Sequence, residues 1–87
     1  MPLSVKLYTL PDCPYCPQME ADLRSLQLER GFQLRTVDLS WHPEVVRRKR
    51  LRAVPSVDIG RQRVIGPTGG EELANIIDGC LKRLVRG

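Results

Sequence analysis

Hydrophobic positions recur along this chain at two spacings, and each spacing predicts one type of secondary structure. Ser4–Thr9 alternates apolar and polar residues, which is typical of a strand. Residues 18–28 repeat their apolar positions at helical spacing, and Gly31 is suited to end that helix. We expect this helix to begin near Cys13 or Pro14, because proline fits the first turn of a helix.

The rest of the chain continues this pattern of short elements. Pro43 suits a helix start with Ser40 or His42 as its cap, and Gly60-Arg61 suits a hairpin turn. The further predicted elements are a strand over residues 32–39, a helix over residues 43–51, strands over Ser56–Ile59 and residues 63–65, and a last helix from Gly69-Gly70 to about Val85.

The order of these elements, β-α-β-α-β-β-α, restricts the fold. The first β-α-β unit predicts parallel strands joined by a right-handed crossover, and the final β-β step predicts an antiparallel hairpin. The sequence therefore predicts an α/β fold with a four-stranded mixed sheet and three helices. At 87 residues the chain is near the lower end of self-sufficient size, so we expect one domain over residues 1–87.

Two cysteines, Cys13 and Cys16, lie where the first strand meets the first helix. Helix N-termini carry free N–H groups and a partial positive charge, which lower the pKa of a nearby thiol. Because the thiolate is the nucleophile, this position favours a pair that cycles between dithiol and disulfide. We expect Cys13 to be the exposed nucleophile and Cys16 the more buried resolving thiol. Tyr15, between them, is expected to offer an exposed contact surface to a substrate.

The segment Cys13-Pro14-Tyr15-Cys16 resembles the active-site tetrapeptide of the dithiol glutaredoxins. The resemblance implies the minimal thioredoxin-like fold and a thiol–disulfide oxidoreductase in which Cys13 and Cys16 are catalytic. Pro14 then supports the site by stiffening the ring that the disulfide closes.

A second segment, Val54-Pro55, resembles the loop in which the thioredoxin-like superfamily holds a cis-proline facing the dithiol. The resemblance implies a cis peptide bond before Pro55. It also leaves the backbone of Val54 free to pair with an extended substrate beside Cys13.

The turn at Gly69-Gly70 resembles the glycine-rich turn before the last helix of the glutaredoxins, which holds a carboxylate of glutathione. The resemblance implies that Gly70 and Glu71 bind that carboxylate and that Arg47 or Arg50 pairs with the other one. The chain departs from the family at Leu10, where many glutaredoxins carry Lys, and at Ala53, where they commonly carry Thr. Gly70 also stands where the family usually has Cys or Ser.

The chain is basic, with 14 Lys and Arg residues against 10 acidic residues and a net charge of +4. Much of the positive charge lies in one cluster: Arg47, Arg48, Lys49, Arg50 and Arg52. Such clusters can bind nucleic acid, but no aromatic residue is interleaved with this one. We therefore expect a solvated helix face beside a site that handles anions, and no nucleic-acid partner.

Three cysteines do not form a disulfide framework, so a metal site is the main alternative for the pair. Zinc needs four ligands, and the soft set available is Cys13, Cys16, Cys80 and His42. Cys80 falls on the apolar stripe of the last helix, which predicts a core position, so we expect no metal site and no bound cofactor. A metal or iron–sulfur carrier stays open as an alternative, as does a basic-helix binding module with a redox-sensing dithiol.

These observations predict a reductase of protein disulfides or glutathione mixed disulfides, with glutathione as the reductant. The nearest alternative is a glutaredoxin-like electron donor recycled by thioredoxin reductase, of the kind that serves ribonucleotide reductase. No apolar run reaches membrane-spanning length, and no signal-peptide pattern opens the chain. We therefore expect a cytoplasmic monomer whose partners are its reductant and disulfide-containing proteins.

Overall fold

The computed structural model describes the backbone of residues 3–86 and the side chains of residues 3–85. The expected domain over residues 1–87 also includes Met1, Pro2 and Gly87, which lie outside the described residues. The elements in chain order are β1 (Ser4–Thr9), α1 (Cys16–Arg30), β2 (Gln33–Asp38), α2 (Pro43–Arg48), β3 (Ser56–Ile59), β4 (Gln62–Ile65) and α3 (Gly70–Arg86). None of the helices in the described part of the chain combines the length and apolar content that a membrane span needs.

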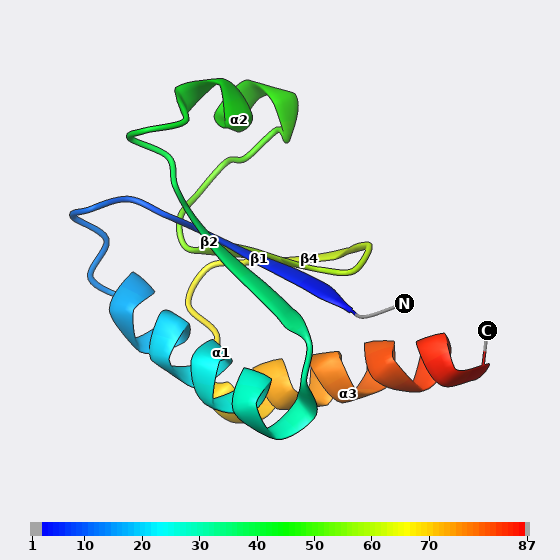
Figure 1. Ribbon diagram of the computed structural model, residues 1–87. Coiled ribbons are helices and arrows are strands. Elements are labelled where there is room, and N and C mark those ends of the chain that lie inside the picture. The colour runs from blue at the N-terminus through cyan, green and yellow to red at the C-terminus, as the bar shows by residue number, and fades with distance from the viewer. Residues whose placement is uncertain (1–2, 87) are drawn as a thin grey trace.

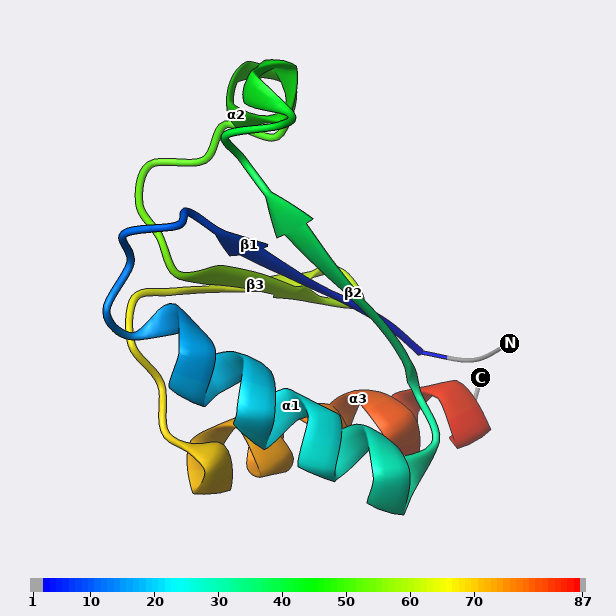
Figure 2. The same ribbon diagram turned by 60° about the vertical axis from the view of Figure 1, so that its left-hand side comes forward.

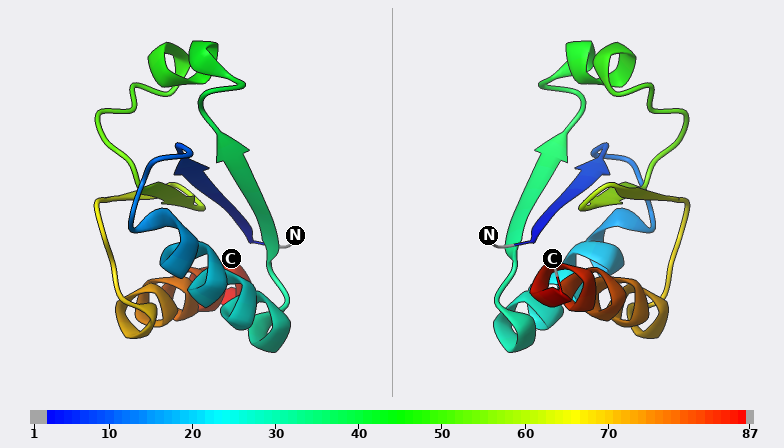
Figure 3. Two further views of the ribbon diagram at one scale, coloured as in Figure 1. Left: turned by 90° about the vertical axis from the view of Figure 1, so that its left-hand side faces the viewer. Right: turned by 90° about the vertical axis from the view of Figure 1, so that its right-hand side faces the viewer.

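The four strands form one mixed sheet in the order β2-β1-β3-β4. β1 pairs with β2 in parallel and with β3 antiparallel, and β3 pairs with β4 antiparallel. Figure 1 shows α2 on one face of the sheet and α1 and α3 on the other. The views in Figures 2 and 3 agree that α1 and α3 lie side by side in one layer. The predicted fold class, a four-stranded mixed sheet with three helices, is confirmed.

The larger core lies between the sheet and the layer of α1 and α3. Val5 and Leu7, alternate residues of β1, point to this side and pack with Leu23, Leu73 and Ile77. All five side chains are at most 1% exposed. Full burial of one such side chain is worth about 1.5–3 kcal/mol. This layer therefore fixes α1, and with it the cysteine pair, against the sheet.

The opposite face of the sheet carries a partly buried polar network. Tyr8 donates a hydrogen bond from its hydroxyl to Asp58 at 3.0 Å, and Arg63 donates to both oxygens of the same carboxylate at 2.7 and 3.1 Å. Burial raises the pKa of Tyr8 to about 12, and the Asp58 charge acts in the same direction. Burial also tends to raise the pKa of Asp58, but the hydrogen bonds from Arg63 and Tyr8 outweigh it and hold that pKa below its ordinary value.

The network also reaches α2. Arg63 donates a hydrogen bond from Nη1 to the backbone oxygen of Lys49 at 2.6 Å, which joins β4 to the residue that follows α2. A small hydrophobic cluster of Tyr8, Leu39 and Val45 fills the space between α2 and the sheet. One side chain of the central strand, Tyr8, thus belongs to both the apolar and the polar contacts under α2.

Several boundaries are confirmed: β1 and β3 begin and end as predicted, and Gly31 ends α1 with a left-handed φ of 72°. The predicted strands over residues 32–39 and 63–65 differ from β2 and β4 by a single residue at their ends. The predicted end of α2 near Leu51 is wrong, because the helix ends at Arg48. Arg50 has a left-handed φ of 55°, which turns the chain out of the helix.

The predicted start of α1 near Cys13 or Pro14 is also wrong, because the helix begins at Cys16. The N–H of Cys13 donates to the backbone oxygen of Leu10 at 3.1 Å, so Cys13 closes a turn after β1 and does not open the helix. The helix is instead opened by Pro17 in its first turn, where a missing N–H costs no hydrogen bond.

The Asp58 network predicts a loss of stability in acid. Because folding lowers the pKa of Asp58, its contribution is complete above the ordinary value of 3.8 and is lost as the pH falls through the folded-state pKa. We expect Asp58→Asn to lower the free energy of unfolding at pH 7 by about 1.5–3 kcal/mol, the range for hydrogen bonds to a charged group. Urea unfolding at a series of pH values from 7 to 2 should show that the difference in the free energy of unfolding between the parent chain and Asp58→Asn shrinks as the pH falls. Asp12→Asn, at an exposed position in the β1–α1 loop, is the matched control, and a stability difference that stays constant with pH would contradict the prediction.

Candidate functional site

The loop between β1 and α1 carries the cysteine pair. The N–H of Cys13 donates to the backbone oxygen of Leu10 at 3.1 Å, which closes a tight turn after β1. The first helical hydrogen bond runs from the N–H of Met19 to the oxygen of Tyr15 at 3.3 Å. Cys16 is therefore the first helical residue, and Cys13 lies in the turn just before the helix N-terminus.

Cys13 and Cys16 form a disulfide, with their Cα atoms 5.5 Å apart. Cys13 is 8% exposed and Cys16 is 4% exposed, so the prediction of an exposed Cys13 is wrong for the disulfide form. The turn folds Cys13 back toward the sheet, whereas the neighbouring Pro14 and Tyr15 face outward. Tyr15 is 56% exposed, which confirms its predicted exposure beside the pair, and its contact with a substrate stays a prediction.

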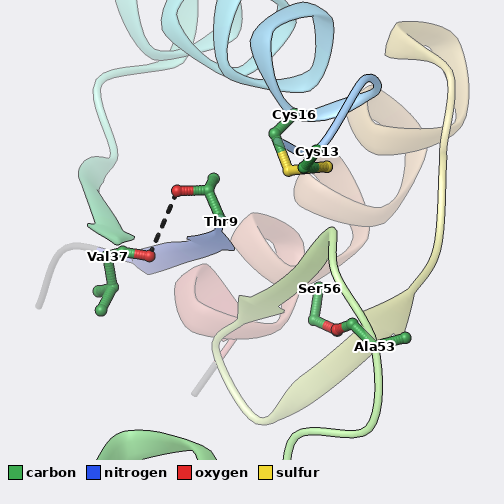
Figure 4. The surroundings of a disulfide bond; sticks show 6 residues. All are labelled: Thr9, Cys13, Cys16, Val37, Ala53 and Ser56. Carbon is green, nitrogen blue, oxygen red and sulfur yellow. Dashed lines mark hydrogen bonds between the residues drawn. A yellow bond between two sulfur atoms is a disulfide. The ribbon is translucent and has the colours of Figure 1, made fainter. Parts of the chain in front are cut away.

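The loop before β3 lies next to the disulfide. Figure 4 shows Ala53 of this loop and Ser56, the first residue of β3, near Cys13 and Cys16, with Thr9 at the end of β1 on another side. The peptide bond between Val54 and Pro55 is cis, as the resemblance implies. The hydroxyl of Ser56 donates to the oxygen of Ala53 at 2.6 Å, which braces the loop.

Pro55 and Val54 differ in how their backbones are used. The oxygen of Pro55 accepts a hydrogen bond from the N–H of Gly66 at 2.8 Å. Within residues 3–86, neither the N–H nor the oxygen of Val54 has a hydrogen-bond partner. The backbone of Val54 is therefore available to an incoming strand at the edge of this loop.

A small hollow of about 170 Å³, which we call the dithiol hollow, opens beside the disulfide. Glu20 lies on its wall one helical turn after Cys16, and Thr36 of β2 also borders it. The hydroxyl of Thr36 is buried and has no hydrogen-bond partner among the described residues. The sequence analysis identified neither Glu20 nor Thr36 as a site residue. Glu20 could have been found, because it follows Cys16 by four positions and residues at that spacing lie on the same face of a helix.

A second depression, the apolar groove, lies between the β1–α1 loop and the chain that follows α2. It has a volume of about 300 Å³. Its lining residues are Leu10, Leu39, Val46, Leu51, Arg52, Ala53 and Val54. Leu10 borders both the apolar groove and the dithiol hollow, so the two depressions adjoin. An apolar side chain in the groove would lie next to the cysteine pair and to the Val54 backbone.

The predicted cations Arg47 and Arg50 are exposed and border neither depression. Arg52, from the same basic cluster, lines the apolar groove instead. Since α2 ends at Arg48, the residues after it run toward β3, and this brings Arg52 to the groove.

The predicted carboxylate-binding turn at Gly70 and Glu71 opens α3. It lies against the side chain of Asp22, because a Cβ built on Gly70 would be 3.4 Å from Asp22 Cγ and 3.5 Å from Oδ2. Asp22 lies six positions after Cys16 on α1. A carboxylate of the protein therefore already faces the positive end of α3.

The residues of the zinc alternative are dispersed. Cys80 is 7% exposed, belongs to the core between the sheet and the helices, and donates to the oxygen of Ile59 at 3.8 Å. Its predicted role in core packing is confirmed. His42 lies at the start of α2, 3.7 Å from Glu44. The described residues hold no cluster of three or more His, Cys, Asp or Glu side chains able to bind a metal ion.

Three comparisons place the chain among known proteins. A family model described as "Glutaredoxin-like domain (DUF836)" matches residues 4–77. A search of curated protein sequences found no significant match. Thioredoxin 1 from Thermosipho africanus superposes with a TM-score of 0.81 at 18% identity, over 91% of this chain and 94% of that one.

Two further solved structures are similar. Thioredoxin-2 of the malaria parasite protein secretion machinery gives a TM-score of 0.79 at 18% identity, over 90% of this chain and 82% of that one. The N-terminal domain of the alkylhydroperoxide reductase AhpF from Enterococcus faecalis gives 0.81 at 22% identity, over 88% of this chain and 38% of that one. These likenesses show a thioredoxin-like fold. Together with the Cys13–Cys16 disulfide, they support a thiol–disulfide redox role.

The positions of the three cysteines in the fold predict an order of reactivity. After reduction of the disulfide, we expect an alkylating reagent to label Cys13 first, because it lies in the turn before the N-terminus of α1, where the positive end of the helix favours the thiolate, and Cys80 last, because it is packed in the core. Peptide mass spectrometry over a time course measures this order. Labelling in a denaturant, where all three thiols should react alike, is the control. Labelling of Cys80 ahead of Cys13 in the folded protein would contradict the assignment.

Proposed function

Because this chain belongs to the glutaredoxin-like domain family (DUF836), we propose that it reduces disulfide bonds in proteins or in glutathione mixed disulfides. The observation that carries the proposal is the Cys13–Cys16 disulfide at the start of α1, beside the dithiol hollow and the apolar groove. Cytoplasmic location belongs to this proposal, since a reducing compartment keeps the pair available as a dithiol.

The chemistry transfers two electrons. The Cys13 thiolate attacks one sulfur of the substrate disulfide, the substrate S–S bond breaks, and the leaving thiolate takes up a proton. The Cys16 thiol then loses its proton and attacks Cys13, which releases the second substrate thiol and leaves the Cys13–Cys16 disulfide. Glu20, one turn after Cys16, lines the same hollow and carries the carboxylate that we propose accepts the Cys16 proton; Arg24 lies 3.4 Å from one of its oxygens.

The apolar groove supports protein disulfides as substrates. An extended segment of a substrate could pair with the free backbone of Val54 and place one apolar side chain against Leu10 and Leu51. Pro14 and Tyr15 would lie beside such a segment on the exposed side of the pair. Leu10 extends the apolar surface at the position where many glutaredoxins carry a lysine.

Glutathione is the proposed reductant, bound weakly. The start of α3 at Gly70 and Glu71 supplies N–H groups for one carboxylate, and Arg52, which lines the apolar groove where Arg47 and Arg50 do not, supplies a cation for the other. Asp22 beside Gly70 and the apolar Leu10 both oppose tight binding. These two features favour the second candidate, an electron donor recycled by thioredoxin reductase.

The catalytic assignment is tested with cysteine variants. We expect Cys13→Ser to abolish reduction of a protein disulfide and Cys16→Ser to accumulate a mixed disulfide with the substrate, because only the second variant keeps the nucleophile. Mass spectrometry of non-reduced protein detects the mixed disulfide, and Cys80→Ser is the matched control with unchanged turnover. Full activity in Cys13→Ser would overturn the proposal. Coupling turnover to glutathione reductase or to thioredoxin reductase then identifies the reductant.

The contact of Gly70 with Asp22 predicts how glutathione binding can be improved. We expect Asp22→Asn, in a Cys16→Ser background, to strengthen glutathione binding about two- to fivefold, because one negative charge leaves the positive end of α3. Titration by NMR should shift the amides of Val54, Gly70 and Glu71. Glu29→Gln, which removes a charge from the far end of α1, should have little effect. If glutathione causes no shifts at Gly70 and Glu71, the start of α3 is not part of the glutathione-binding site.

A further inference from the structure

The face of the sheet under α2 holds a pocket of about 230 Å³ that the thiol–disulfide chemistry does not use. We call it the basic pocket. Lys6 of β1, Arg35 of β2, and Arg48 and Lys49 at the end of α2 contribute to its lining. These cations come from three separate parts of the sequence, and only the fold brings them together.

The register of the sheet places two of these positive charges, those of Lys6 and Arg35, side by side on neighbouring strands. Lys6 and Arg35 are partners in the parallel pairing of β1 and β2, where like charges on one face repel. Within residues 3–85, none of the four cations lies within 4.0 Å of a carboxylate oxygen. The folded chain therefore places four positive charges around one pocket, and none of them forms an ion pair with another described residue.

The acidic residues near the basic pocket do not neutralise it. Glu44 is the one carboxylate in its described lining, and it lies 3.7 Å from His42. Asp58 stands opposite Lys6 on β3, but both of its oxygens accept hydrogen bonds from Arg63. Four cationic residues and one carboxylate leave the lining at +3, in a chain whose whole net charge is +4.

We propose that the basic pocket binds an oxyanion of the phosphate class, either as the free ion or as the terminal group of a small molecule. Such an anion would relieve the repulsion among Lys6, Arg35 and Arg48 and would accept hydrogen bonds from their side chains. The volume is below the roughly 300–1,000 Å³ of sites for drug-sized ligands, which favours a small ligand. The pocket lies on the α2 side of the sheet, whereas the cysteine pair opens α1 on the other side (Figure 1). Thr36, on the edge strand β2, borders both the basic pocket and the dithiol hollow, so the two depressions meet at this strand.

Inorganic phosphate and phenyl phosphate, each matched in ionic strength to sodium chloride, test the proposal on the full chain. We expect both to raise the midpoint of thermal unfolding above that in chloride, because a ligand that binds only the folded state stabilises it. We also expect saturable NMR shifts at Lys6, Arg35, Val37 and Val45. Tighter binding of phenyl phosphate than of phosphate would identify a phosphorylated small molecule, and equal binding would identify the free ion.

Charge-removing variants give the second readout. Arg35 and Arg48 are exposed, so Arg35→Gln and Arg48→Gln leave the core intact. Each should weaken phosphate binding roughly tenfold or more. In low salt without phosphate, each should unfold at a higher temperature than the parent chain, because one repelling charge is gone. Arg61→Gln, an exposed cation in the β3–β4 turn and outside the basic pocket, is the control.

Three outcomes would overturn the proposal. Phosphate and chloride could have the same effect at equal ionic strength, which would show charge screening alone. Arg61→Gln could weaken phosphate binding as much as Arg35→Gln does, which would show binding by net charge. A single-stranded oligonucleotide could bind through Lys6 and Arg35 while both small anions fail, which would assign the surface to nucleic acid.

Discussion

The position of α2 depends on the carboxylate of Asp58. This helix has six residues and no side-chain cap, and helices of that length are not stable by themselves in water. What holds it is the small cluster around Val45 and the hydrogen bond from Arg63 to the Lys49 oxygen. Arg63 can make that bond because Asp58 fixes its guanidinium from the other side, while Tyr8 donates a third hydrogen bond to the carboxylate. Both the apolar groove and the basic pocket take part of their walls from α2 or the residues just after it.

The sheet separates two kinds of chemistry. On the side of α1, the cysteine pair lies next to apolar surface, and Leu10 joins the dithiol hollow to the apolar groove. On the side of α2, positive charge gathers over β1 and β2. The basic residues that follow Val46 in the sequence therefore line different depressions. Arg48 and Lys49 line the basic pocket, whereas Arg52 lines the apolar groove. A single cluster in the sequence thus serves two surfaces.

Local signals in the sequence accounted for most of the fold. The alternation in β1, the glycine after α1 and the hairpin at Gly60 each act over a few residues, and each is confirmed. The predicted start of α1 and end of α2 were wrong because the first depends on the turn that Cys13 closes with Leu10 and the second on the left-handed φ of Arg50. The apolar stripe of α3 correctly placed Cys80 in the core, since periodicity alone decides which helix face is buried.

By itself, the sequence determined the cysteine pair at a strand-to-helix junction, the order of the elements and the cis-proline loop that resembles a known family. Only the tertiary structure decided that Cys13 is buried, that Asp22 faces Gly70 and that Thr36 and Glu20 border the disulfide. It also decided that Lys6 and Arg35 meet under Arg48 and Lys49. The physical reason is range: hydrophobic periodicity and turn preferences are properties of neighbouring residues, whereas contacts between distant side chains depend on strand register and on how each helix packs.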